Sequence, residues 1–179
     1  LNKTKNINSV VVATSHESTD DVLFNWCKNK NIHCFRGDIS NVLSRFYESS
    51  CKYSADVIVR VTSDNPLVDP KIIDKTINLF LEENVDYAAN NLIKTFPHGM
   101  DVEVISFEAL QASVEEATKL SDLEHVTQYI RNRPNRFSLA NLKSVDNNYN
   151  IRITLDELED FLLISEVFKK LGEDANYHQ

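Results

Sequence analysis

The chain has 179 residues and a mass of 20.5 kDa, which suits one domain with a hydrophobic core and is short for two. Hydrophobic residues make up 42% of it, and no apolar run approaches the roughly 18 residues of a membrane-spanning helix, so the sequence predicts a globular protein without a membrane span. The net charge is −8 and the 19 Lys and Arg residues are scattered, which argues against nucleic acid as a partner.

The first half of the chain alternates apolar, β-branched runs with helical patterns. A helix is predicted after each of the first three runs, because capping residues such as Asp38 and Asp69-Pro70 precede apolar side chains at i, i+3, i+4 spacing. Strands of this kind, apolar on both faces and separated by helices, are typical of βαβ units. The sequence therefore predicts an α/β fold with a mostly parallel sheet. The predicted strands are residues 7–14, 32–35, 55–61 and 86–89.

The second half is less regular. Its last helix is amphipathic, and Gly172 is the expected stop. No linker or internal repeat interrupts the pattern, so we expect residues 1–179 to form a single domain. The predicted strands are residues 102–105, 137–142 and 151–153, and the predicted helices are residues 107–118, 122–132 and 154–171.

The three cysteines, Cys27, Cys34 and Cys51, show no CxxC spacing. This pattern favours reduced thiols in a cytoplasmic protein over a zinc site or a disulfide.

The loop after strand 55–61 is the most polar of the predicted loops, and it carries Asp64 and Asn65. Ligands of an open parallel sheet bind beyond the carboxyl ends of its strands, so Asp64 is a candidate ligand-binding residue. Asp and Asn also close turns by hydrogen bonding to their own backbone, and composition alone favours that simpler role.

Asp156 opens an acidic stretch directly after strand 151–153. A structural role is again the simpler one, because Thr154 and Glu157 fit a capping box and acids are favoured in a first helical turn. If the two strands lie close in the sheet, however, Asp64 and Asp156 could share one Mg²⁺, which prefers carboxylate and phosphate oxygens.

The segment 96–103 reads FPHGMDVE and is unusually polar for a chain with three glycines. The i, i+2 spacing of Asp101 and Glu103 predicts that both lie on one face of a strand. A hairpin entrance would explain the Pro and Gly, but it does not require His98 and the two acids. A ligand site and a structural turn both remain open for this segment.

Two further pairs of residues have a functional and a structural interpretation. Arg36 and Arg45 could reach an anionic ligand from the loop and helix after the second strand, or they could belong to a surface turn and a solvated face. Glu124 and His125 meet a stronger structural alternative, since Ser121 and Glu124 fit another capping box and a His on a helix is more often structural.

Six motifs are similar, in order, to those of one known family. They are FRGD with NVLSRFY (35–47), RVTSDNPLVDP (60–70), DYAANN (86–91), FPHGMDVEVIS (96–106), EHVTQYI (124–130) and ITLDELEDF (153–161). The chain thus resembles, over nearly its whole length, the spore-coat polysaccharide biosynthesis cytidylyltransferases, which are relatives of the CMP-Kdo and CMP-sialic acid synthetases. The resemblance implies the Rossmann-like, three-layer α/β sandwich of the nucleotide-diphospho-sugar transferases.

The resemblance also implies an activity, which is transfer of CMP from CTP to a sugar or sugar acid with release of pyrophosphate and with Mg²⁺ as cofactor. Asp64 and Asp156 match the family's metal-binding aspartates and would be both metal ligands and catalytic residues. Relatives are commonly dimeric, so a homodimer is one expectation. The positions implied in substrate binding are Arg36, Arg45, Asn65, His98, Asp101, Glu103, Glu124 and His125.

Two departures from the family pattern qualify this expectation. The family opens with a strand and a loop rich in Gly, Arg and Lys that wraps the triphosphate, and no such loop follows Leu1, so we expect a partial chain, N-terminally truncated, that would not turn over CTP by itself. Leu123 stands where the family motif has Arg, and Leu offers no charge-assisted hydrogen bond to an anionic substrate.

Because of these departures, a non-catalytic binding module is an alternative function. A glycosyltransferase of the same fold is another, although the sequence lacks a DxD metal motif.

Overall fold

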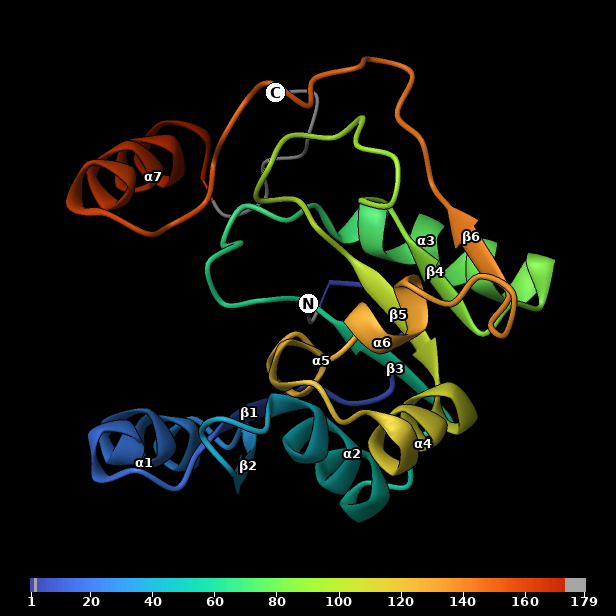
Figure 1. Ribbon diagram of the computed structural model, residues 1–179. Helices are drawn as coiled ribbons and strands as arrows, with labels where there is room; N and C mark the ends of the chain where they lie inside the picture. The colour runs from blue at the N-terminus through green and yellow to red at the C-terminus, as the bar shows by residue number, and fades with distance from the viewer. Residues whose placement is uncertain (2, 173–179) are drawn as a thin grey trace. The chain divides into compact units, whose positions relative to one another are not determined.

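The structure is a computed structural model that describes residues 1 and 3–172 (Figure 1). These residues group into two compact units. Unit one contains residues 7–58 and 105–139, together with residue 1. Unit two contains residues 3–6, 59–104 and the chain from residue 140 on. The single-domain interpretation of residues 1–179 stays a prediction, because such a grouping does not measure whether the units fold independently.

Unit one begins with a parallel pair of strands, β1 (Val11–Ser15) and β2 (His33–Gly37), in which Val11 lies opposite His33. The helices α1 (Asp21–Asn29) and α2 (Val42–Lys52) pack against this pair, and a 3-10 turn, η1 (Ser18–Asp20), precedes α1. This is the strand-helix alternation that the sequence predicts.

The rest of unit one is helical. α4 (Phe107–Glu116) packs against α2, and the rings of Tyr47 and Phe107 stack with their centroids 5.7 Å apart. The predicted helix 122–132 is wrong: two short helices, α5 (Leu120–Glu124) and α6 (Gln128–Arg131), stand in its place. The chain breaks between them at buried Val126, whose φ of 48° lies in a region that β-branched residues rarely adopt.

The second sheet has four strands in the order β3-β5-β4-β6. α3 (Pro70–Glu83) packs against β4, and its first turn is capped by the Asp69 carboxylate, which accepts a 2.7 Å hydrogen bond from the amide of Lys71. The strands are β3 (Val57–Arg60), β4 (Tyr87–Ala89), β5 (Glu103–Ser106) and β6 (Leu139–Asn141).

Two predicted elements near the C-terminus differ from the structure. Residues 151–153 form only an isolated bridge between His98 and Arg152, in place of the predicted strand. The last helix, α7 (Leu158–Leu171), begins four residues later than predicted, because residues 154–157 are held in an irregular turn by side-chain hydrogen bonds described below.

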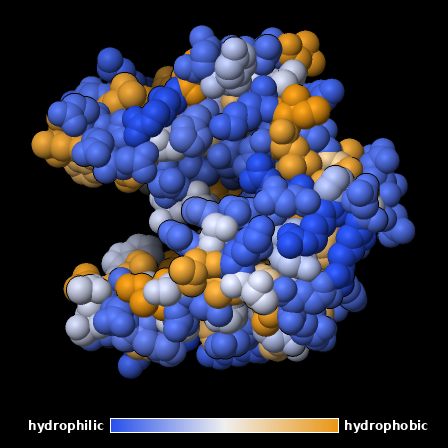
Figure 2. All heavy atoms as spheres, viewed as in Figure 1, coloured by the Kyte–Doolittle hydropathy of each residue, from blue (hydrophilic) through white to orange (hydrophobic). Residues whose placement is uncertain are grey.

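The apolar face predicted for α7 is present but is not buried. Figure 2 shows hydrophobic side chains at the surface of this helix, and Phe161 and Leu162 are each more than half exposed, whereas Ile164 is buried. In the described part of the chain, no helix is both long enough and apolar enough to cross a membrane.

We predict that Leu110→Ala lowers the free energy of unfolding by about 2–5 kcal/mol, because Leu110 of α4 is fully buried and its loss leaves a cavity. The matched control is Leu120→Ala, which truncates the same side chain at a position that is 83% exposed and should change stability by less than about 0.5 kcal/mol. Urea unfolding of both variants measures the difference, and equal effects would contradict the packing described for unit one.

Candidate functional site

Asp64 lies in a tight turn directly after β3. The amide of Asn65 donates to the carbonyl of Thr62 at 3.1 Å, and the Thr62 hydroxyl donates to Oδ1 of Asp64. Pro66 then prevents the turn from continuing as a helix. The turn therefore fixes the Asp64 carboxylate through one oxygen. In the part of the chain that the structure describes, Oδ2 accepts no hydrogen bond.

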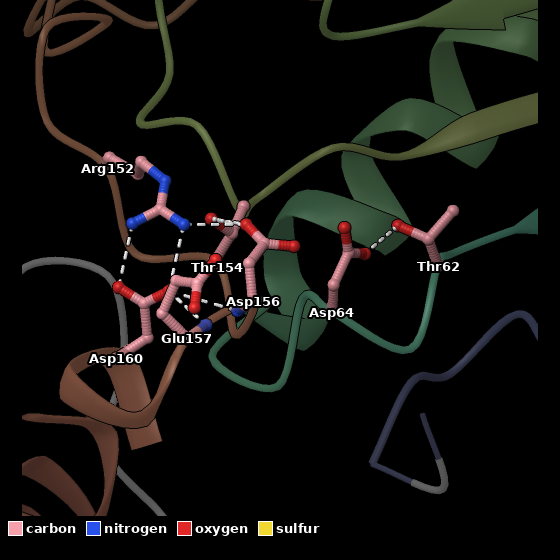
Figure 3. A network of polar contacts seen from close by, with 7 residues as sticks. All are labelled: Thr62, Asp64, Arg152, Thr154, Asp156, Glu157 and Asp160. Carbon is pink, nitrogen blue, oxygen red and sulfur yellow. Dashed lines mark hydrogen bonds and ion pairs between the residues drawn. The ribbon is translucent and has the colours of Figure 1, made fainter. Parts of the chain in front are cut away.

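The turn at Asp64 is joined to the segment that carries Asp156. The amide of Leu155 donates a 2.8 Å hydrogen bond to the carbonyl oxygen of Asp64. This bond places the residue before Asp156 directly against the Asp64 backbone, and Figure 3 shows an oxygen of Asp156 directed toward Asp64. The structure thus brings together the two carboxylates that the sequence predicted as a pair.

Arg152 organises the acidic stretch around Asp156. Its guanidinium contacts Asp156 at 2.6 Å and both oxygens of Asp160 at 2.7 and 2.8 Å (Figure 3). The Thr154 hydroxyl donates to Oδ2 of Asp156 at 2.8 Å. These hydrogen bonds, first that of Thr154 and then that of Arg152, lower the pKa of Asp156, so its carboxylate is charged at neutral pH.

Asp160 caps the start of α7, in the role that the sequence assigned to Thr154 and Glu157. Its Oδ2 accepts hydrogen bonds from the amides of Asp156 and Glu157, each at 3.0 Å. The pKa of Asp160 is lowered, mainly by Arg152 and then by these amides. The predicted pairing of Thr154 with Glu157 is wrong because the Thr154 hydroxyl is already bonded to Asp156.

Gly99 brings the segment 96–103 against the segment that leads to Asp156. The amide of His98 donates to Ile151 at 2.9 Å, and the amide of Ile153 donates back to His98 at 2.8 Å. Gly99 has a φ of 110°, and a Cβ placed on it would lie 2.7 Å from the carbonyl carbon of Ile153. Only glycine allows this approach, which accounts for the Gly that the sequence pattern singled out.

Asp101 and Glu103 do not share one strand face, contrary to the prediction. β5 begins at Glu103, whose side chain is buried and accepts a 2.7 Å hydrogen bond from the Tyr87 hydroxyl together with an ion pair from Arg60. Asp101 lies before the strand and lines a cavity together with His98. Glu103 is therefore positioned to stabilise the core, while Asp101 is available to a ligand.

The Asp101 carboxyl is held in a partly desolvated position. Burial raises its pKa, and the neighbouring charge of Glu103 acts in the same direction, whereas His98 and the Asn91 amide oppose the shift.

Arg36 and Arg45, both in unit one, differ in what they can offer a ligand. The guanidinium of Arg36 is already bonded to the carbonyls of Ser15 and Glu17 and to Asp21, at 2.6 to 2.8 Å. Arg45 donates to one carbonyl at 2.8 Å, and its Nε is buried without a partner in the described residues. Arg45 is therefore the better candidate for an anionic ligand.

Glu124 and His125 are exposed at the end of α5. The amide of Thr127 donates to the carbonyl of His125 around the strained Val126, so this turn holds the two side chains at the surface. The predicted capping box at Ser121 is wrong, because α5 already begins at Leu120 and its N-cap is Lys119.

The side chain of Asp20, directly before α1, turns back to β1 and makes no cap hydrogen bond to the helix. Its Oδ2 accepts hydrogen bonds from the Ser15 amide and from the hydroxyls of Ser15 and Thr14, at 2.6 to 2.8 Å. These bonds, the Ser15 hydroxyl first, lower the pKa of Asp20 to about 2.

The residues Asp64 and Asp156 fit a magnesium ion. No group of three or more His, Cys, Asp or Glu side chains forms a complete metal site among residues 1 and 3–172. Mg²⁺, however, usually takes one or two carboxylates and completes its shell with water and phosphate oxygens. Each aspartate has one oxygen without a hydrogen bond in the described structure, which suits such a shared ligand set.

Comparison with known proteins identifies the family. The sequence profile of the family described as Cytidylyltransferase matches residues 1–176. The chain belongs to this family. The uncharacterized protein MJ1063 of Methanocaldococcus jannaschii is 37% identical over 171 residues, which are 94% of this chain and 69% of that protein. The spore coat polysaccharide biosynthesis protein SpsF of Bacillus subtilis is 34% identical over 173 residues, which are 94% and 70% of the two chains.

Solved structures agree with this cytidylyltransferase assignment. A cytidylyltransferase from Leptospira borgpetersenii is similar with a TM-score of 0.94 and 27% identity, over 99% of this chain and 76% of that one. A CMP:2-keto-3-deoxy-manno-octonic acid synthetase complexed with CTP is similar with a TM-score of 0.62 over 97% and 84% of the two chains, and its 9% identity shows likeness of fold alone. The predicted Rossmann-like α/β fold is confirmed.

We predict that Gly99→Ala destabilises the protein by clearly more than Gly172→Ala. Both glycines have positive φ, so both substitutions incur the strain of about 1 kcal/mol that a side chain meets there. A Cβ at residue 172 meets nothing within 4 Å, whereas at residue 99 it collides with the backbone of residues 153 and 154. Denaturant midpoints compare the two variants, and equal midpoints would contradict the close approach described here.

We predict that Asp20→Asn flattens the acid dependence of stability. The folded pKa of Asp20 is lowered to about 2 from 3.8, so its contribution to stability is present above about pH 4 and is lost as the pH falls toward 2. Urea unfolding at several pH values between 2 and 7 should show a smaller loss in this variant than in the wild type. Asp56→Asn, at an exposed position, is the control, and identical pH profiles for all three proteins would refute the assignment.

Proposed function

We propose that the protein transfers CMP from CTP to a sugar or sugar acid and releases pyrophosphate, in the synthesis of a surface polysaccharide. The family assignment supports nucleotidyl transfer. The printed name of the SpsF relative supports the polysaccharide pathway, and the CTP complex of the structural neighbour supports the nucleotide. The observation that carries the proposal is the hydrogen bond from Leu155 to Asp64, which brings Asp156 beside Asp64.

In this reaction the acceptor hydroxyl releases its proton to solvent and forms a bond to the α-phosphorus of CTP, while the bond from that phosphorus to the pyrophosphate oxygen breaks and pyrophosphate leaves. A Mg²⁺ held by Asp64 and Asp156 would neutralise the charge on the phosphate oxygens. Asp64 and Asp156 cannot bind a triphosphate by themselves, because like charges repel. Their task in this proposal is to position the cation and, with it, the nucleotide.

Arg152 supports the proposed role of Asp156 as a metal ligand. The hydrogen bonds of the Thr154 hydroxyl and then of Arg152 lower the pKa of Asp156, and the positive charge of Arg152 offsets the repulsion between Asp156 and Asp160. Ion pairs as exposed as this one contribute little net energy, in the range of about 0–1 kcal/mol, so a cation can compete for an oxygen of Asp156 without a large loss of stability.

We predict that Asp64→Asn and Asp156→Asn each weaken divalent metal binding by at least about tenfold, because each substitution removes one charged ligand. Mn²⁺ serves as the probe in place of Mg²⁺, and electron paramagnetic resonance measures its binding. CTP binding in the presence of Mg²⁺, followed by isothermal titration calorimetry, should weaken in parallel.

The control for this experiment is Glu166→Gln, which removes an exposed carboxylate from α7 and should leave both affinities unchanged. Wild-type Mn²⁺ affinity in both aspartate variants would refute the metal site. CTP binding by the wild type without pyrophosphate release in the presence of acceptors would favour the alternative of a binding module.

A further inference from the structure

Arg152 is bound to Asp160 and Asp156 in different ways (Figure 3). Its Nη1 donates to Oδ1 of Asp160 at 2.7 Å, and its Nη2 donates to Oδ2 of the same residue at 2.8 Å. Nη2 also donates to Oδ2 of Asp156 at 2.6 Å. The guanidinium is therefore bidentate to Asp160, whereas it contacts Asp156 through one nitrogen that the two acids share.

The pair of Arg152 with Asp160 does not depend on Asp156. The Asp160 side chain is 14% exposed, against 48% for Asp156, and two backbone amides at the start of α7 hold its Oδ2. A bidentate pair between a guanidinium and a carboxylate is stronger and better oriented than a single contact. Arg152 can thus release Asp156 and remain bound to Asp160.

Asp156 also keeps its orientation when Arg152 releases it. The Thr154 hydroxyl donates to Oδ2 of Asp156 at 2.8 Å, and the backbone bond from Leu155 to Asp64 holds the segment in place. Arg152 is therefore not required to aim this carboxylate at Asp64. What it adds at Asp156 is a positive charge 2.6 Å from one of the two oxygens.

A positive charge at this distance competes with a divalent cation for the same carboxylate, because like charges repel. We propose that Arg152 is a resident counter-ion of Asp156, which balances this acid in the metal-free protein and lowers its affinity for a divalent cation. The inference rests on the proposed function, because it concerns the metal site of Asp64 and Asp156, and it adds how the affinity of that site is set. Arg152 acts through Asp156 and is a positioning residue.

Mn²⁺ binding to the full chain, measured by electron paramagnetic resonance, tests this role. Arg152→Gln should bind Mn²⁺ at least about fivefold more tightly than the wild type, because the competing charge is gone. Arg152→Lys keeps the charge and should stay within about twofold of the wild type. The gain in Arg152→Gln should shrink as NaCl rises from about 0.05 M to about 1 M, since the Debye length falls to about 3 Å.

The matched control is Arg131→Gln, which removes the same charge from α6 and should leave the Mn²⁺ affinity unchanged. Thermal unfolding without metal establishes that each variant is folded. If Arg152 only supported the local structure, both of its substitutions would weaken Mn²⁺ binding. Unchanged or weaker binding by Arg152→Gln overturns the inference, and so does an equal gain in Arg131→Gln.

Side-chain NMR of the wild type gives a second readout that needs no substitution of Arg152. Saturating Mg²⁺ should shift the guanidinium resonances of Arg152 and leave those of Arg131 in place. Resonances of Arg152 that do not move overturn the inference.

The same measurements separate this inference from the fate of the proposed function. Mn²⁺ binding that depends on both aspartates but is not tightened in Arg152→Gln contradicts the counter-ion and leaves the proposed metal site in place. Mn²⁺ binding that is tightened in Arg152→Gln, in a protein that does not bind CTP, supports the counter-ion and contradicts the nucleotidyl transfer. Absence of Mn²⁺ binding in both the wild type and Arg152→Gln refutes the metal site and the counter-ion together.

Discussion

The backbone hydrogen bond from the Leu155 amide to the Asp64 carbonyl is the contact on which the candidate site depends. It joins the turn after β3 to the turn before α7, two segments far apart in sequence. Neither turn is regular secondary structure, so no strand or helix ladder holds them together. This bond therefore fixes the segment that carries Asp156 against the turn that carries Asp64.

The approach of the segment 96–101 supports this contact from a second direction. The paired backbone bonds of His98 with Ile151 and Ile153 hold residues 151–153 extended, although they form only one bridge. Gly99 makes the bonds possible because it has no side chain where the backbone of Ile153 passes. The local conformation of one glycine therefore determines where Leu155, and with it Asp156, can lie.

Much of this arrangement could be predicted from the sequence. The βαβ alternation and the Asp69-Pro70 start of α3 were visible as local patterns. The pairing of Asp64 with Asp156 was an expectation that depended on two strands lying close together and on the family resemblance, and the two segments are joined in the structure by the Leu155 amide. Turn chemistry and periodicity are local properties, and so they survive in a single sequence. The unusual density of polar groups around Gly99 also singled out this segment, and the structure adds the close contact that requires the glycine.

The remaining features depend on contacts between distant residues. The contacts of Arg152 could not be predicted from the sequence, because its guanidinium reaches Asp156 and Asp160 from an irregular turn and not along a helix face. The i, i+2 spacing of Asp101 and Glu103 was misleading because β5 begins only at Glu103, whose side chain is drawn into the core by Tyr87 and Arg60.

The short segment from Asn150 to Asp156 borders two different environments, which are the cavity of unit two and the acidic turn at Asp156. On one side it lines a cavity that contains the Asp101 carboxyl together with the side chains of Lys94 and His98, and at its end it presents the charged carboxylate of Asp156. Arg152 contributes to both environments, because it lines the cavity and pairs with Asp156. The Arg152 guanidinium pairs with Asp156 and Asp160, so it offsets the negative charge of these two acids at the edge of the cavity. In the proposed transfer reaction both substrates would have to meet at one phosphorus atom, and a segment that borders both the cavity and the Asp64–Asp156 pair would help to set the distance between them.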